Sequence, residues 1–176
     1  MQNLYPAIIS ATSGLLGVMI GGLITYVVQR TQRRHDKEEE RKALACGIAA
    51  ELEAYLDLMD ARNHAASIKS LIASLHGGQD LKLSVIQRAD GRVPDFFPLT
   101  FAQLNKVGLL GEITADLARF YTGLAGVFAT MDTANSGRFD GLPIANKIDL
   151  LEKELALWEN TTRVGRATVM QLKKIA

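Results

Sequence analysis

A long uncharged segment at the N-terminus constrains this chain more than any other feature. Residues 1–29 contain no Asp, Glu, Lys or Arg, and the run from Tyr5 to Val28 is mostly apolar. About 20 consecutive apolar residues in helical form cross the hydrocarbon core of a bilayer. The segment therefore predicts a single transmembrane helix. A cleaved signal peptide would need a positive start and a shorter apolar stretch, and a buried soluble helix would need neighbours on every side; both remain alternatives.

The charges that follow this segment predict its orientation. Arg30, Arg33 and Arg34 precede the first acidic residue, whereas the N-terminal side offers only the α-amino group. Cytoplasmic flanks of membrane helices carry an excess of Lys and Arg. We therefore expect the N-terminus outside and the C-terminal part in the cytoplasm. The three arginines are expected at the membrane surface, on anionic headgroups, which makes the lipid bilayer the first expected partner.

Small residues recur every four positions along the predicted membrane helix and form two adjacent rows on one face. The residues predicted to form this interface are Ser13, Gly14, Gly17, Gly21, Gly22 and Thr25. Membrane helices associate by close packing of small residues, so the face predicts self-association or docking to another membrane helix. The alternative is that such residues are simply common in membrane helices.

The rest of the chain has the composition of a folded domain. All 20 basic and 19 acidic residues follow position 29, and the net charge is +1. Nucleic-acid binding usually needs a pronounced basic face, so we expect no nucleic-acid partner. Cys46 is the only cysteine, which excludes an intramolecular disulfide and fits a reducing compartment. The expected organisation is a transmembrane anchor (1–29), a charged juxtamembrane helix (30–42) and a cytosolic helical bundle (43–176).

Apolar spacing predicts helices in the first half of this domain. The membrane helix is expected to continue without a break, with an apolar stripe from Leu44 that ends at His76, before two glycines. Residues 79–98 show no clear period. Leu81, Leu83 and Val85 alternate as in a short strand, but a single strand has nothing to pair with, so a short helix over 81–88 is preferred. Another is expected from Pro98 to Val107, ended by the glycine that follows.

Two later segments have the clearest helical period. Apolar residues at alternating steps of three and four run from Ile113 to Met131. A second seam repeats this spacing, and its members are Ile144, Ile148, Leu151, Leu155, Trp158 and Thr162, extended by Val169 and Leu172. Such spacing indicates helices that pack nearly antiparallel. The predicted fold is therefore all-α, with a single N-terminal transmembrane helix continuing into a cytosolic antiparallel helical bundle.

A short pattern in this domain resembles that of a known group of proteins. Val107-Gly-Leu-Leu110, then Glu112-Ile113, then Phe120-Tyr121, is similar to a pattern in uncharacterised bacterial and phage proteins with one N-terminal span and a helical cytosolic domain. The likeness covers residues 1–60 in layout and 96–125 in motif. It implies a shared fold and a place in the bacterial inner membrane, and it brings no catalytic residue with it.

Motifs for phosphate binding or hydrolysis are absent from the sequence. It has no glycine-rich loop ending in GK[ST], no GxSxG elbow and no HExxH pair. A segment starting at Asp132 resembles an EF-hand only superficially, because Ala134 stands where a carboxylate ligand belongs. We expect no catalytic residue, no cofactor and no metal site.

One set of ionisable residues nevertheless lies on a single predicted helical face. Glu53, Asp57, Asp60 and His64 are spaced four, three and four residues apart. Such groups suit a metal or an acid–base site. They also suit the water-facing side of a bundle helix, which is the interpretation we favour.

These features favour a non-enzymatic, membrane-anchored interaction or scaffold protein. It would self-associate through its transmembrane helix and present a helical domain to the cytoplasm. One alternative is an accessory subunit of a larger inner-membrane complex, whose small-residue face meets a foreign membrane helix. Another is a holin-like, membrane-disrupting effector. An enzyme comes last, because neither a nucleophile–base pair nor a metal set is visible.

Overall fold

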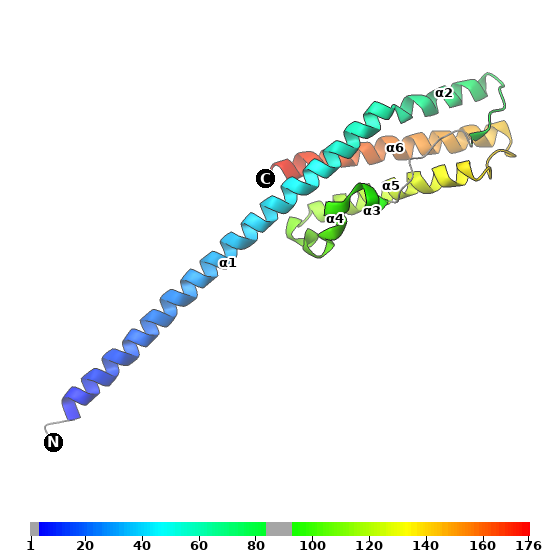
Figure 1. Cartoon of the computed structure of the whole chain (residues 1–176). Coiled ribbons are helices and arrows are strands. Elements are labelled where there is room, and N and C mark those ends of the chain that lie inside the picture. The colour runs from blue at the N-terminus through cyan, green and yellow to red at the C-terminus, as the bar shows by residue number, and fades with distance from the viewer. Residues whose placement is uncertain (1–3, 84–92) are drawn as a thin grey trace. The chain divides into compact units, whose positions relative to one another are not determined.

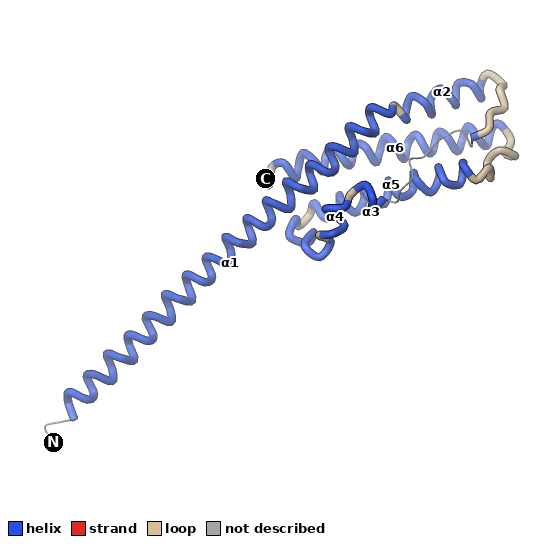
Figure 2. The backbone as a smooth tube through the Cα atoms, viewed as in Figure 1, coloured by secondary structure: helices blue, strands red, loops and turns tan. Residues whose placement is uncertain are grey.

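The structure, a computed structural model, describes residues 4–83 and 93–176, with the side chains of residues 4–18, 20 and 94 left out of the description. It forms two compact units, residues 1–41 and 42–176. The described residues form helices joined by turns, without a strand (Figure 2). The all-α prediction is confirmed. The helices in Figure 1 are α1 (Leu4–Arg62), α2 (His64–His76), α3 (Val93–Phe96), α4 (Pro98–Ala102), the 3₁₀ helix η2 (Leu104–Leu110), α5 (Ile113–Asn135) and α6 (Ile144–Lys173).

Helix α1 begins in the first unit and ends in the second, which confirms the predicted helical continuity across residues 30–42. Within the first unit, the side chains from Gly21 to Glu40 are all exposed. Across the described part of the chain, no helix is both long and apolar enough to cross a membrane. Most of the span predicted from Tyr5 to Val28 consists of residues whose side chains are left out of the description, so the span stays a prediction.

The core of the second unit confirms the apolar stripes predicted for α1 and α5. From α1 it takes Leu44, Ile48, Leu52, Tyr55, Leu56 and Met59, and from α5 it takes Ile113, Leu117, Phe120, Leu124, Val127 and Met131. These positions repeat at steps of three and four, so each helix directs one apolar face inward. Figure 1 shows α2, α5 and α6 side by side, with the α5–α6 hairpin that the sequence predicts.

Three ion pairs show the register of α6 against α1 and α2. They are Glu53–Lys173 at 2.6 Å, Asp60–Arg166 at 2.6 Å and Lys69–Glu159 at 3.0 Å. Residue numbers rise along α1 and α2 while those of their partners on α6 fall, so α6 runs antiparallel to both helices. On α6, Glu159, Arg166 and Lys173 follow one another at intervals of seven residues. On the other side, seven residues separate Glu53 from Asp60, and nine separate Asp60 from Lys69. The two extra residues coincide with the junction between α1 and α2.

The prediction of one unbroken helix ending at His76 is wrong, because the helix is interrupted at this junction. Asn63 takes a left-handed conformation, with φ 52°, and separates α1 from α2. Asparagine tolerates this region better than most residues. The apolar period hides the break because α2 continues along α6. The predicted end at His76 is confirmed, with the Gly77 N–H donating to the Ala73 carbonyl at 3.0 Å.

The segment after Pro98 also differs from its prediction. Helix α4 ends at Ala102, and η2 then runs through Gly108 to Leu110. Gly108 has an ordinary negative φ, whereas Gly111 adopts φ 62° and follows the last turn. Glycine adopts positive φ readily, and here the glycine that ends the helical segment is Gly111, three residues after the predicted Gly108. The short helix expected over 81–88 lies largely outside the described residues.

The buried Phe97 holds this segment in the core between α1 and α5. Its ring centroid lies 4.8 Å from that of Tyr55 on α1 and 4.9 Å from that of Tyr121 on α5. A third ring, Phe120, meets it edge-on at 5.8 Å. Such tilted aromatic pairs each contribute about 0.5–1.5 kcal/mol beyond the area they bury. The segment from α3 to η2 is thus part of the core and not a loose connection.

Candidate functional site

The predicted membrane-helix interface is described only in part. Ser13, Gly14 and Gly17 lie outside the residues whose side chains are described. A Cβ added at Gly21 or Gly22 meets no atom of the chain within 4 Å. The Thr25 hydroxyl donates to the Gly21 carbonyl at 2.8 Å, which satisfies it within its own helix. Every residue of this stretch of α1 from Gly21 on is exposed, so the free space at the two glycines does not distinguish them from their neighbours, and the interface stays a prediction.

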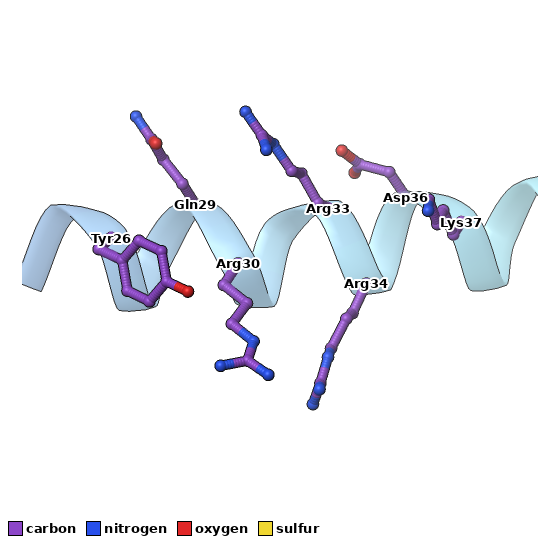
Figure 3. A pocket seen from close by; sticks show the side chains of 7 residues that line it. All are labelled: Tyr26, Gln29, Arg30, Arg33, Arg34, Asp36 and Lys37. Atoms are coloured by element: carbon purple, nitrogen blue, oxygen red, sulfur yellow. The ribbon is translucent and has the colours of Figure 1, made fainter.

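The predicted basic cluster follows directly on α1. Its grooves are lined by Tyr26, Gln29, Arg30, Arg33, Arg34, Asp36 and Lys37. Figure 3 shows Gln29 and Arg33 extending from one side of the helix and Arg30 and Arg34 from the other. Because these side chains project from a single helix, the space among them is an open groove. The exposed guanidinium groups retain their full capacity to bind phosphate through paired hydrogen bonds.

The ionisable set on α1 and α2 does not converge on a site. Glu53 pairs with Lys173, and Asp60 accepts two bonds from Arg166, at 2.8 and 2.6 Å. His64 instead meets Trp158 edge-on, with ring centroids 5.1 Å apart. No group of three His, Cys, Asp or Glu side chains within the described ranges is placed to hold a metal ion. The two carboxylates serve as links between α1 and α6.

Sequence reasoning placed the seam of α6 correctly only in part. The predicted Leu151, Trp158, Val169 and Leu172 are buried. The most buried line of α6 runs through Lys147, Leu151, Glu154, Trp158, Thr161, Gly165, Thr168 and Leu172. The predicted Ile144, Ile148 and Leu155 are only partly buried. The physical reason is that α6 packs between α5 and the α1–α2 pair, so its most buried line faces both neighbours. The sequence does contain a sign of this buried line, because Lys147, Glu154, Thr161 and Thr168 are spaced seven residues apart. A search for apolar residues does not find it, because all four are polar.

Lys147 forms hydrogen bonds to residues 80 and 81, in the segment that follows α2. Its side chain is only 1% exposed, and its Nζ donates to Asp80 Oδ1 at 2.6 Å and to the Leu81 carbonyl at 3.2 Å. Two residues later, the Leu83 N–H donates to Asp140 Oδ1 at 3.1 Å. The Leu83 side chain is 1% exposed. These bonds hold residues 80–83 against the start of α6, with the Leu83 side chain buried in the bundle.

A small cavity lies between α2, α5 and α6, next to Leu83. Its volume is about 40 Å³, and its polar lining groups come from His64, Ser67, Thr130 and Glu154. Glu154 is 7% exposed, and its Oε1 has no hydrogen-bond partner. Burial raises the pKa of Glu154, and a hydrogen bond with Thr130 opposes part of that rise. An orphaned carboxyl oxygen in an apolar core is costly, because its desolvation is uncompensated.

His64 stands at the edge of the same cavity in its neutral form. Burial lowers its pKa, and the nearby Arg62 lowers it further. The imidazole therefore brings no positive charge to Glu154 at neutral pH. Two hydroxyls, Ser67 and Thr130, line the same cavity, and each donates to the backbone carbonyl four residues earlier, at 3.3 and 3.2 Å.

A second polar cluster ties α4 to α1 and has a structural role. Glu51 accepts hydrogen bonds from the N–H groups of Leu99 and Thr100, the latter at 2.9 Å, and from the Thr100 hydroxyl at 2.7 Å. The Tyr121 hydroxyl donates to Thr100 Oγ1 at 3.0 Å, and burial raises the pKa of this phenol. Glu51 thus satisfies amides at the start of α4 that have no partner within the helix.

Comparison with family models, with curated proteins and with solved structures finds no match for this chain. The resemblance of the segment from Val107 to Tyr121 to bacterial and phage proteins therefore stays a prediction.

Proposed function

We propose that this chain is a membrane-anchored interaction protein of the bacterial inner membrane. Its N-terminal helix would span the bilayer and self-associate, and residues 43–176 would form a helical domain at the cytoplasmic face. One observation carries the proposal. A single helix, α1, joins an uncharged segment of 29 residues to an exposed basic cluster and then to a bundle core.

The exposed apolar side chains near the end of that segment support lipid as its surroundings. Leu23, Ile24 and Val27 are 67%, 57% and 53% exposed. Met19 and Val28, which are 64% and 54% exposed, are nine residues apart and therefore lie on roughly opposite sides of the helix, so a partner on one side would leave one of them in water. Lipid covers all sides at once. Tyr26 and the arginines that follow are the residue types that favour the membrane–water boundary.

The small residues support an interaction role for the helix. Gly21 and Gly22 leave open space where a side chain would be, and close backbone approach is how membrane helices commonly pair. No nucleophile–base pair or metal set among the described residues argues for chemistry. A domain fixed at the membrane, with an assembly surface in its anchor, suits a scaffold.

The first test is the mass of the tagged full-length chain extracted from its own membranes in a mild detergent. A multiple of 19.2 kDa is the expected result. Gly21→Leu is expected to reduce the mass toward one chain, because the added side chain fills the proposed contact surface without meeting its own chain. Leu23→Phe adds bulk on the opposite side of the helix and serves as the matched control.

Each other outcome has a defined meaning. A chain recovered in the soluble fraction would refute the membrane anchor, and a monomeric chain in the membrane would refute self-association. A mass that includes a second polypeptide would make the chain an accessory subunit. Loss of assembly in Leu23→Phe as well as Gly21→Leu would show that bulk anywhere on the helix disrupts assembly, and would remove the small-residue face from the proposal.

A further inference from the structure

An open groove lies between α5 and α6, with a volume of about 690 Å³. Its floor is made of small or short side chains, namely Ala118, Thr122, Gly123, Thr161, Val164 and Ala167. An added Cβ at Gly123 would collide with the Thr161 side chain, so the two helices approach closely there. How near a further helix can come depends on the side chains at the contact, and this floor permits a close approach.

The groove carries a net positive charge. Arg119 projects from α5 and Arg163 from α6, and both are exposed. Among the described residues that line the groove, the one acid is Asp116. It pairs with Arg119 at 2.9 Å and accepts a hydrogen bond from Gln171 at 3.3 Å. Two cations and one anion leave a balance of +1, so an occupant with one exposed carboxylate complements the groove.

The outward face of α1 in the same domain is poor in charge. Its exposed members include Cys46, Ala50, Ala54, Leu58 and Ala61, on the side opposite the buried stripe. Leu58 is 41% exposed. By contrast, most exposed positions of α6 between residues 149 and 166 are charged, as is usual for a helix face that meets water. The chain itself leaves this face of α1 uncovered.

Asp57 is the acidic residue of the outward face of α1. Glu53 and Asp60, the acids on either side of it, pair with Lys173 and Arg166 of α6. Asp57 is exposed, and within the described residues it makes no hydrogen bond or ion pair. The face thus offers small side chains and one free carboxylate, which complement the groove in shape and in charge.

Asp57 and Arg119 lie at nearly the same height along the bundle. Asp60 pairs with Arg166 at 2.6 Å, and the preceding residue of α6 lies against the Phe120 ring, so Asp60 and Phe120 share one level. Both α1 and α5 run antiparallel to α6 and therefore parallel to each other. Asp57 precedes Asp60 by three residues and Arg119 precedes Phe120 by one, a difference of two residues or about 3 Å of helix.

We propose that the α5–α6 groove receives the outward face of α1 from a second copy of this chain, with Asp57 of that copy against Arg119. The two faces are different surfaces, so the contact is head-to-tail, and its repetition builds a closed ring or an open row of copies. Matching heights require neighbouring copies in the same orientation, which a common membrane imposes; in this respect the inference rests on the proposed function. It adds an association surface in the cytosolic domain to that of the membrane helix.

The test is chemical crosslinking of the full-length chain in the intact cells that express it. Cys46→Ala removes the native thiol, and Asp57→Cys with Arg119→Cys places one thiol on each proposed surface. All three positions are exposed, so the fold tolerates these changes. A short bis-maleimide is expected to give a ladder of successive multiples of 19.2 kDa, because each chain links to two neighbours.

Two controls use the same Cys46→Ala background. Asp57→Cys alone is expected to stay monomeric, because a head-to-tail contact does not bring two copies of one residue together. Asp57→Cys with Glu152→Cys, an exposed position of α6 outside the groove, is the matched pair and is expected to give no ladder.

Charge reversal tests the ion pair independently. Asp57→Arg and Arg119→Glu, each in the chain with its native Cys46, are each expected to raise the dissociation constant of the assembly about fivefold, because a partly exposed ion pair contributes modestly. The double variant restores opposite charges and is expected to recover the wild-type value. Sedimentation of the full-length chain in mild detergent over a range of concentrations measures these constants.

Several results would overturn this inference. A missing ladder, or an equal ladder from the Glu152 pair, would exclude the groove contact. Dimers from Asp57→Cys alone would mean that two α1 faces meet symmetrically. A double variant that associates no better than the single ones would exclude the contact of Asp57 with Arg119.

The outcome is distinguishable from that of the proposed function. Multimers in the mass measurement without a crosslinked ladder would refute the groove contact and leave assembly through the membrane helix standing. A ladder that persists with Gly21→Leu would show that the groove contact holds without the small-residue face. A ladder from a chain recovered in the soluble fraction would support the groove contact and refute the membrane anchor.

Discussion

Replacing Glu154 by methionine is expected to stabilise the protein, and the gain should grow with pH. The substitution removes a buried oxygen that has no partner, a defect that costs about 1–3 kcal/mol. It also loses a hydrogen bond with Thr130, worth about 1 kcal/mol. Methionine fills a similar volume and adapts to irregular space. The expected net gain is about 1 kcal/mol at acidic pH.

The pH dependence follows from the direction of the Glu154 pKa shift. Burial raises the pKa of this carboxyl in the folded state, while the unfolded chain ionises near the ordinary value. Between these two pKa values the unfolded state releases a proton that the folded state retains. The folded wild type therefore loses about 1.4 kcal/mol of stability per pH unit in that window. Glu154 contributes its full stability below the unfolded pKa, and loses it as pH rises through the folded pKa.

Equilibrium chemical denaturation across a pH series measures this difference. The free energy of unfolding of Glu154→Met minus that of the wild type should rise with pH above the ordinary glutamate pKa, and then level off. Glu152→Gln serves as the surface control and should show no such rise. A difference that stays flat or falls with pH would mean that Glu154 is ionised and paired in the folded protein. Either result would refute the reasoning.

Two further predictions concern packing and helix starts. Gly165→Ala should destabilise the domain by about 1–2 kcal/mol, because the new Cβ would lie 2.7 Å from a phenylalanine ring of α5 and overpacking outweighs the gain in helix propensity. Gly126→Ala has one 3.3 Å neighbour at a flexible leucine and should change the denaturation midpoint far less; equal losses would contradict this account. Glu51→Ala should cost about 1–2 kcal/mol, because it strips hydrogen bonds from the start of α4, including those of Thr100. The exposed ion-pair variant Glu53→Ala should cost under about 1 kcal/mol, and the reverse order in denaturant melts would argue against the capping role.

Helix periodicity in the sequence succeeded where one helix face meets one neighbour. The stripe from Leu44 to Met59 and the seam from Ile113 to Met131 are buried as expected. It failed at Asn63 because a single left-handed residue changes the direction of the chain without interrupting the apolar pattern. The spacing of apolar residues indicates which face of a helix is buried. It carries little information about the backbone conformation of a single residue such as Asn63.

The seam of α6 shows a different limit. Its buried line includes Lys147, Glu154 and Thr168, which a hydrophobicity pattern assigns to the surface. A buried lysine is tolerated only because Asp80 and the Leu81 carbonyl come from another part of the chain to meet it. Partners brought from 66 and 67 positions away leave no trace in local spacing.

The sequence by itself determined the helical class, the hairpin of α5 and α6, and a long uncharged segment at residues 1–29 joined to a basic cluster. These properties follow from periodicity and composition, which act locally along the chain. Only the tertiary structure decided that Glu53 and Asp60 are links between helices, and that Glu154 lies beside a cavity without a partner. Burial and hydrogen-bond partnership depend on which helix packs against which, and that contact geometry is a property of the folded bundle.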